Sequence, residues 1–212
     1  MIVFDLFAGT CSSTRAFEDA GDTVISVDND DRFEVTLQAD VFALTADFIV
    51  EKYGRPDFVW ASPPCTAFSV ASMGYHWLPD RNPRTEAAMT SMDLVRHTRQ
   101  LIEDLTPRFG FVIENPRGML RKLPMLDGIE RKTVTYCQYG DDRMKPTDLW
   151  TNLDWEPRPM CKNGDVCHEA APRGAKTGTQ GRGGAVTRSM VPYELGAEIR
   201  QAILYAVAGG ED

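Results

Sequence analysis

Short apolar runs alternate with amphipathic segments along the 212 residues, and this alternation constrains the fold more than any other feature of the sequence. Parallel strands are buried on both faces and are joined by helices, so the pattern predicts an α/β protein with a mostly parallel sheet and helices on both faces. The expected strands are Ile2–Ala8, Thr23–Asp28, Asp57–Ala61, Phe109–Glu114, Lys132–Tyr139 and Asp148–Asn152.

Four helices are expected between and after these strands, namely Ser12–Ala20, Ala43–Tyr53, Pro83–Leu105 and Pro192–Ala208. In the third helix, Asn82 is a candidate N-cap and Pro83 suits the first helical position, where a missing N–H costs nothing. In the last helix, Leu195, Ile199 and Ile203 recur at helical spacing and predict one buried face.

Composition excludes several classes of protein. No apolar run reaches the length of about 18 residues that suggests a transmembrane helix, and residues 1–8 carry an acid and lack a basic leader. We therefore expect a cytoplasmic protein without a membrane partner. The five cysteines are an odd number, which argues against a disulfide framework and for reduced thiols.

The net charge is -8, but the charges are unevenly distributed. Residues 143–190 carry eight Lys and Arg against five Asp and Glu, and apolar periodicity disappears between Glu156 and Arg188. Within that stretch, Gly174–Gly184 reads as an irregular loop. The sequence therefore predicts a core over residues 1–153, a short basic insert over 154–188 and a C-terminal helix over 189–212. The basic insert is the expected place for a polyanion, and a solvated surface loop is the alternative.

The first expected strand runs through Asp5-Leu6-Phe7-Ala8-Gly9-Thr10-Cys11 directly into a helix. Asp28 closes the second strand nineteen residues after Gly9, where nucleotide-binding folds place a carboxylate on ribose hydroxyls. The turn has one glycine, whereas a pyrophosphate needs several for close approach to the backbone. This favours a cofactor without phosphates.

Two further strand ends carry reactive groups. Ser62-Pro63-Pro64-Cys65 follows the third expected strand, and the two prolines fix the backbone before the thiol. Cys65 is therefore a candidate nucleophile, with an inert buried cysteine as the ordinary alternative. Glu114-Asn115-Pro116 ends the fourth strand and would place Glu114 on the same edge of the sheet.

In this order and at this spacing, the three segments resemble motifs of the DNA (cytosine-5)-methyltransferase family. Asp5-Leu6-Phe7-Ala8-Gly9 resembles the cofactor motif, Ser62-Pro63-Pro64-Cys65 with Phe68-Ser69 the nucleophile loop, and Glu114-Asn115 the acid motif. The resemblance covers roughly residues 1–153 and the helix after Val191-Pro192. It implies a Rossmann-like S-adenosylmethionine-dependent methyltransferase fold.

The chain departs from the family pattern at several positions. Cys11-Ser12 stands where the family has a glycine pair, Thr66 stands in place of glutamine, and Pro116 stands in place of valine. The short insert replaces the family's large target-recognition domain. Short or degenerate sequence preference is therefore expected, because direct readout needs several side chains placed in the major groove.

The resemblance also implies ligands for S-adenosylmethionine. Asp28 would bind the ribose hydroxyls, and Asp40, at an expected third strand end, would bind the adenine amine. The full set of implied cofactor contacts is Phe7, Gly9, Thr10, Cys11, Asp28, Asn29, Asp40, Val41, Pro63, Ser189 and Val191.

For catalysis, the resemblance implies that Cys65 adds to C6 of cytosine and that the resulting enamine takes the methyl group at C5. Glu114 would hydrogen-bond N3 and the exocyclic amine, and Arg143 and Lys145 would contact the target. The substrate would be DNA with the cytosine flipped out of the duplex, in a bacterial or phage-infected cell, and a protein partner could supply specificity.

Two alternatives remain open. One is a C5-methyltransferase that acts on RNA or nucleotides, or that transfers a modified group, because a fold does not fix a substrate. The other is a non-catalytic nucleic-acid-binding module, against which the pairing of Cys65 with Glu114 argues.

Cys161, Cys167 and His168 in the insert have two interpretations. A zinc ion would organise a loop too polar to fold alone. Their spacing is not a standard zinc pattern, so the sequence favours ordinary reduced cysteines and no metal.

Overall fold

The computed structural model describes residues 1–170 and 184–208. These residues form one seven-stranded sheet in the order β3-β2-β1-β4-β5-β7-β6. Its strands are β1 (Ile2–Leu6), β2 (Thr23–Asp28), β3 (Leu37–Gln38), β4 (Phe58–Ala61), β5 (Gly110–Pro116), β6 (Glu130–Thr135) and β7 (Pro146–Thr151). Among these described strands, β7 alone runs antiparallel to its neighbours, so the expected mostly parallel sheet is confirmed.

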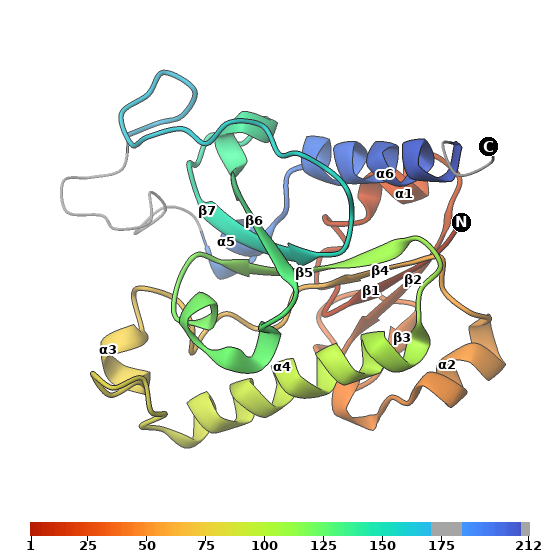
Figure 1. The fold of residues 1–212 in the computed structure, drawn as a ribbon, viewed down its shortest axis with the longest axis horizontal. Helices are drawn as coiled ribbons and strands as arrows, with labels where there is room; N and C mark the ends of the chain where they lie inside the picture. Colours follow the sequence, from red (N-terminus) through yellow and green to blue (C-terminus); the bar gives the residue numbers. More distant parts are fainter. Residues whose placement is uncertain (171–183, 209–212) are drawn as a thin grey trace.

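Helices cover both faces of the sheet, as expected (Figure 1). α1 (Arg15–Asp19) and α6 (Tyr193–Ala208) pack together on one face, and α2 (Ala46–Tyr53) and α4 (Glu86–Leu105) cover the other. The shorter elements are α3 (Met73–His76), α5 (Ala185–Ser189) and 3-10 helices at Val41–Ala43, Leu120–Lys122, Pro124–Leu126 and Tyr136–Tyr139.

Side chains of the central strands alternate between two apolar clusters, one under each helical layer. In β1, Val3 packs in the cluster that contains Phe17 of α1 and Leu195 of α6, while Phe4 and Leu6 pack in the cluster under α4. This period of two residues is that of a strand buried on both faces. Because the strand faces are covered, a ligand must enter at the carboxyl ends of the strands.

α6 lies directly on the turn that follows β1. A Cβ added at Gly196 would lie 2.7 Å from the Ser13 carbonyl oxygen, closer than real Cβ contacts allow. The absence of a side chain at this position lets the helix approach the turn. The C-terminal part of the chain thereby contacts the edge of the sheet where the first motif lies.

The expected start of the long helix at Asn82 and Pro83 is wrong. α4 begins at Glu86, and Thr85 is its N-cap, with the side chain accepting a hydrogen bond from Ala88 N at 3.2 Å. Pro83 pairs instead with Trp77 in an isolated bridge. Thr is also a favourable N-cap when its hydroxyl accepts from a free helical N–H. The bridge between Trp77 and Pro83 keeps Pro83 outside the helix, so the helix begins after Thr85.

Other boundaries differ from the sequence-based expectation as well. The helix expected over Ala43–Tyr53 begins at Ala46, and the strand expected over Ile2–Ala8 ends at Leu6. The strand expected over Lys132–Tyr139 ends at Thr135, and a 3-10 helix follows that ends at Gly140, whose φ is +87°. The first helix begins at Arg15 rather than Ser12, because the hydroxyls of the two preceding residues bind the Asp5 carboxylate at 2.7 Å.

The insert carries neither helix nor strand over residues 154–170. The expected loop at Gly174–Gly184 lies, except for Gly184, outside the described residues. Within residues 1–170 and 184–208, no helix has the length and apolarity needed to cross a membrane.

Candidate active site

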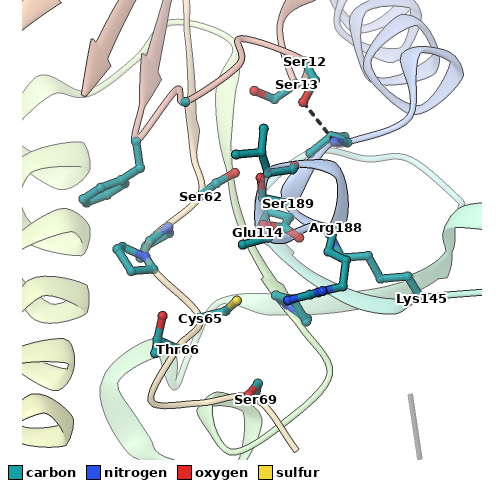
Figure 2. Close-up of a pocket in the computed structure, with 18 of the residues that line it drawn as sticks. Ser12, Ser13, Ser62, Cys65, Thr66, Ser69, Glu114, Lys145, Arg188 and Ser189 are labelled. Carbon is teal, nitrogen blue, oxygen red and sulfur yellow. Dashed lines mark hydrogen bonds between the residues drawn. The ribbon is translucent and has the colours of Figure 1, made fainter. Parts of the chain in front are cut away.

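The carboxyl ends of β1, β4 and β5 open into a cavity of about 880 Å³ (Figure 2). Its wall combines the turn after β1, the loop after β4, the end of β5, the start of β7 and residues 185–191. The volume is within the range of about 300–1,000 Å³ that is typical of ligand pockets. Ligands of open α/β sheets bind at this edge, so the cavity is the candidate active site.

Cys65 lies in this wall, on the loop after β4. Asn115 Nδ2 donates to the Pro63 carbonyl oxygen at 2.8 Å, just before the thiol. The backbone N–H groups of Phe68 and Ser69 donate to the Cys65 carbonyl oxygen at 3.0 and 2.9 Å, just after it. Contacts on both sides therefore fix the position from which the thiol faces the cavity.

The chain after β5 passes so close to this loop that Gly118 has no room for a side chain. A Cβ at Gly118 would lie 2.2 Å from the Phe68 carbonyl oxygen, to which Met119 N donates at 2.7 Å. The loops that leave β4 and β5 thus form one packed unit. This packing sets the position of Cys65 relative to Glu114.

Glu114 is buried near the end of β5, with an exposed fraction of 5%. The Tyr136 hydroxyl donates to its Oε1 at 2.9 Å. Burial raises the pKa of Glu114, and the charge of Lys145 and the Tyr136 hydrogen bond partly offset this. A raised pKa favours the protonated form of the carboxyl, which suits a group that shares a proton with a ring nitrogen.

Two cationic side chains flank the thiol. Burial raises the pKa of Cys65 and the charge of Glu114 raises it further, whereas Lys145 and Arg188 lower it. Lys145 is itself buried, with Nζ 4.4 Å from the ring centroid of Tyr136. In Figure 2 the side chain of Arg188 extends toward the sulfur of Cys65. Formation of the thiolate therefore depends on these two cations.

Replacement of Lys145 by methionine, which removes the charge at similar length, should shift the pH profile of Cys65 alkylation to higher pH. Lys145 lowers the pKa of the thiol, so its loss leaves less thiolate at a given pH. Iodoacetamide labelling at Cys65, followed by peptide mass spectrometry between pH 6 and 10, measures this as a severalfold lower rate at about pH 8. Lys52→Met, on α2, is the control. An unchanged profile in Lys145→Met would show that its charge does not act on Cys65.

The turn after β1 forms the other side of the cavity. Gly9 has a φ of +50°, a left-handed conformation that favours glycine, and its N–H donates to Asp28 Oδ2 at 2.8 Å. Val191 N donates to the Ser12 hydroxyl at 2.9 Å, which is the dashed contact in Figure 2. These hydrogen bonds link the turn after β1 to the end of β2 and to the segment before α6, at the side of the cavity.

The structure brings part of the expected cofactor set to the cavity. Of the expected cofactor contacts, six line the cavity, namely Phe7, Gly9, Thr10, Pro63, Ser189 and Val191. Cys11, Asp28, Asn29, Asp40 and Val41 do not line it. Asp40 lies two residues beyond β3 and caps a 3-10 helix by accepting from Phe42 N at 3.0 Å, and Val41 is buried in the core.

Of the two expected basic contacts, Lys145 lines the cavity and Arg143 does not. Arg143 is buried, forms an ion pair with Asp141 and donates to the Thr187 carbonyl oxygen at 2.6 Å. Its guanidinium therefore tethers the end of the insert. Arg188, one residue beyond Thr187, takes the place beside the thiol.

Sequence reasoning missed several residues of the site. Tyr136, Ser62 and Arg188 each act near Cys65 or Glu114, and Arg32 and Phe33 line the cavity beyond β2. Ser62 stands within the nucleophile segment, and Arg188 stands directly before Ser189. The sequence could therefore have identified both residues as members of the site. The sequence carried no signal for Tyr136, because its contact with Glu114 depends on the register of β6, β7 and β5.

The strand order, the single antiparallel strand and the cavity at the carboxyl edge define a Rossmann-like methyltransferase fold. Residues 1–125 match the family described as C-5 cytosine-specific DNA methylase. The chain therefore belongs to this family.

The chain is also similar to individual proteins. The chain is 28% identical over 174 residues to "Probable DNA (cytosine-5)-methyltransferase" of Frog virus 3 (isolate Goorha), a match that covers 79% of this chain and 78% of that protein. The solved structure "Crystal structure of putative DNA modification methyltransferase encoded within prophage Cp-another structure (E.coli)" is 20% identical, with a TM-score of 0.54 over 77% of this chain and 52% of that chain.

A mutant of Spodoptera frugiperda DNMT2 is 15% identical, with a TM-score of 0.47 over 80% of this chain and 57% of that chain. The chain thus spans about half the length of the solved structures that it matches.

Proposed function

We propose that this protein transfers a methyl group from S-adenosylmethionine to C5 of cytosine in DNA. The observation that carries the proposal is the arrangement of Cys65 and Glu114 in one cavity with the β1 turn. The family defines the reaction class, and these two groups are the nucleophile and the acid that C5 transfer needs.

The residues present fit S-adenosylmethionine. The aromatic Phe7, the apolar Val191 and the polar Thr10 all line the cavity, and a single glycine shapes the turn after β1. A sulfonium nucleoside needs aromatic and polar contacts of this kind but no pyrophosphate cradle. When bound, it would supply an electrophilic methyl group.

The protein's own groups would prepare the cytosine. The Cys65 thiolate would form a bond to C6 while Glu114 holds N3 and the exocyclic amine, so that electron density collects at C5. Once C5 carries the methyl group, the C5 proton passes to a water molecule, and the electrons of that bond re-form the C5–C6 double bond as the bond between C6 and the Cys65 sulfur breaks. Lys145 and Arg188 favour the thiolate before attack and after departure.

DNA as substrate is tested by label transfer. The purified protein is incubated with methyl-tritiated S-adenosylmethionine and, in separate reactions, duplex DNA, single-stranded DNA, RNA and cytidine nucleotides. We expect label in DNA, recovered as 5-methylcytosine after digestion. Label confined to RNA or nucleotides would favour the alternative substrates, and cofactor binding without transfer to any substrate would favour a non-catalytic module.

Replacement of Asp28 by alanine should weaken S-adenosylmethionine binding. The change removes both the proposed ribose contact and the acceptor that holds Gly9 N. A lost charge-assisted hydrogen bond of about 1.5–3 kcal/mol corresponds to a Kd roughly 10- to 100-fold higher by calorimetry. Asp93→Ala, at an exposed ion pair on α4, is the control. An unchanged Kd for Asp28→Ala would remove Asp28 from the cofactor site.

A further inference from the structure

Four potential metal ligands meet outside the cavity, at the 3-10 helix that follows β6. Cys137 belongs to this helix, and Cys161, Cys167 and His168 come from the insert. The four ligand atoms all lie within 4.8 Å of one another, and none of the four residues lines the active-site cavity. Three of these residues lie close together in the sequence, whereas Cys137 lies outside the insert.

Three of the distances within this cluster are close to those of a tetrahedral site. The Cys167 sulfur lies 3.6 Å from that of Cys137 and 3.4 Å from His168 Nδ1, and the Cys161 sulfur lies 3.7 Å from the same nitrogen. Zinc with bonds of about 2.3 Å to sulfur and about 2.0 Å to nitrogen needs ligand separations of about 3.5–3.8 Å. The Cys137 and Cys161 sulfurs, at 2.9 Å, are closer and would separate slightly around an ion.

The surroundings support the ligands and close the site. Cys137 and Cys161 are buried, and Cys167 and His168 are partly buried. Cys161 N donates to the Thr135 hydroxyl at 3.1 Å, and Gln138 Nε2 lies 3.3 Å from the Cys167 sulfur, where it can donate to a thiolate. Hydrogen bonds of this kind, from residues that do not themselves bind the metal, orient metal-binding side chains.

Trp155 packs in the apolar cluster under α6 and Arg143 holds Thr187, but within residues 159–170 only Cys161 is buried. Residues 154–170 form no helix or strand, and the apolar cluster here consists of Cys137, Met144 and Cys161 with Cys167. Arg158 pairs with Glu194 and Glu198 and so fixes only the beginning of the segment. A loop that buries so little apolar surface cannot offset the entropy of ordering, whereas a metal ion can.

We propose that Cys137, Cys161, Cys167 and His168 bind one structural zinc ion that anchors the insert to the turn after β6. Three thiolates and one imidazole complete four-coordinate zinc, which leaves no position for a substrate. Binding through Nδ1 puts the ring proton on Nε2, so the long 3.4 Å contact from Gly164 N gives way to water. Because Cys137 adjoins Tyr136, the ion also steadies the segment that contacts Glu114.

The metal content of the untagged full chain, purified under reducing conditions without chelator, tests the proposal directly. We expect one zinc per chain by mass spectrometry of the metal, and cobalt(II) exchange should give the visible absorption of tetrahedral thiolate coordination. Cys161→Ser and Cys167→Ser should lose the ion, whereas Cys11→Ser, a change outside the cluster, should retain it. Zinc retained in both cluster variants would place the site elsewhere and overturn the proposal.

The wild-type protein keeps the test valid if a cluster variant fails to fold. Removal of zinc by a chelator should increase amide hydrogen exchange over residues 154–170 while β1 and β4 stay protected. A folded, metal-free protein whose three cluster cysteines react as free thiols, or in which Cys137 and Cys161 form a disulfide, would refute the zinc site. These readouts involve no methyl transfer, so they do not depend on the proposed function.

Discussion

Cys65→Ser should reduce methyl transfer to DNA by roughly 10⁴-fold or more, because loss of a covalent nucleophile removes the step on which the others depend. The serine hydroxyl is nearly isosteric but remains protonated in a buried site where even the thiol has a raised pKa. Its affinity for S-adenosylmethionine should stay near that of the wild type. Tritium transfer and calorimetry measure the two quantities separately.

The control is Thr90→Ser, a conservative change at an exposed position of α4 that does not line the cavity. An oligonucleotide with 5-fluorocytosine gives a second readout, because fluorine cannot leave C5 as a cation and the sulfur adduct persists. The wild type should form a denaturant-stable complex that maps to Cys65, and Cys65→Ser should form none. Normal turnover in Cys65→Ser would exclude covalent catalysis by this residue.

Glu114→Gln should lower the turnover rate by roughly 10²- to 10⁴-fold, the usual contribution of a positioned acid or base. Glutamine keeps the volume and can still accept from the Tyr136 hydroxyl, so the buried site stays packed. It cannot share a proton with N3. The loss should therefore appear in kcat, measured at saturating DNA and S-adenosylmethionine, more than in the affinity for either.

Glu51→Gln, on the exposed surface of α2, is the control for the charge change. The two variants also differ in their pH profiles. Because burial raises the pKa of Glu114 in the folded protein, the wild-type rate should change as this group titrates above the ordinary range of a carboxylic acid. In Glu114→Gln, this change in rate with pH should be absent. If the same change persists in the variant, another group causes it.

The sequence by itself determined the fold class and the main motifs. Short apolar runs such as Phe58–Ala61 have no polar alternation, which is typical of strands covered on both faces. Chemical groups at the ends of such strands must share one edge of the sheet. For this reason the sequence alone assigns Gly9, Cys65 and Glu114 to one site.

Tertiary structure alone decided which groups surround these residues. Tyr136 reaches Glu114 through the register of an antiparallel strand, and Arg188 rather than Arg143 lies beside the thiol because Asp141 and Thr187 hold the other guanidinium. Side-chain periodicity reports burial but not such long-range pairing.

The cysteine cluster is the clearest case of a long-range contact that sequence periodicity does not report. Cys137 and Cys161 are separated by 24 residues, and their sulfurs lie 2.9 Å apart only because the insert folds back on the turn after β6. Ligand spacing along the chain identifies metal sites when the ligands come from one short segment. Here two segments supply them, so their convergence is a property of the tertiary structure.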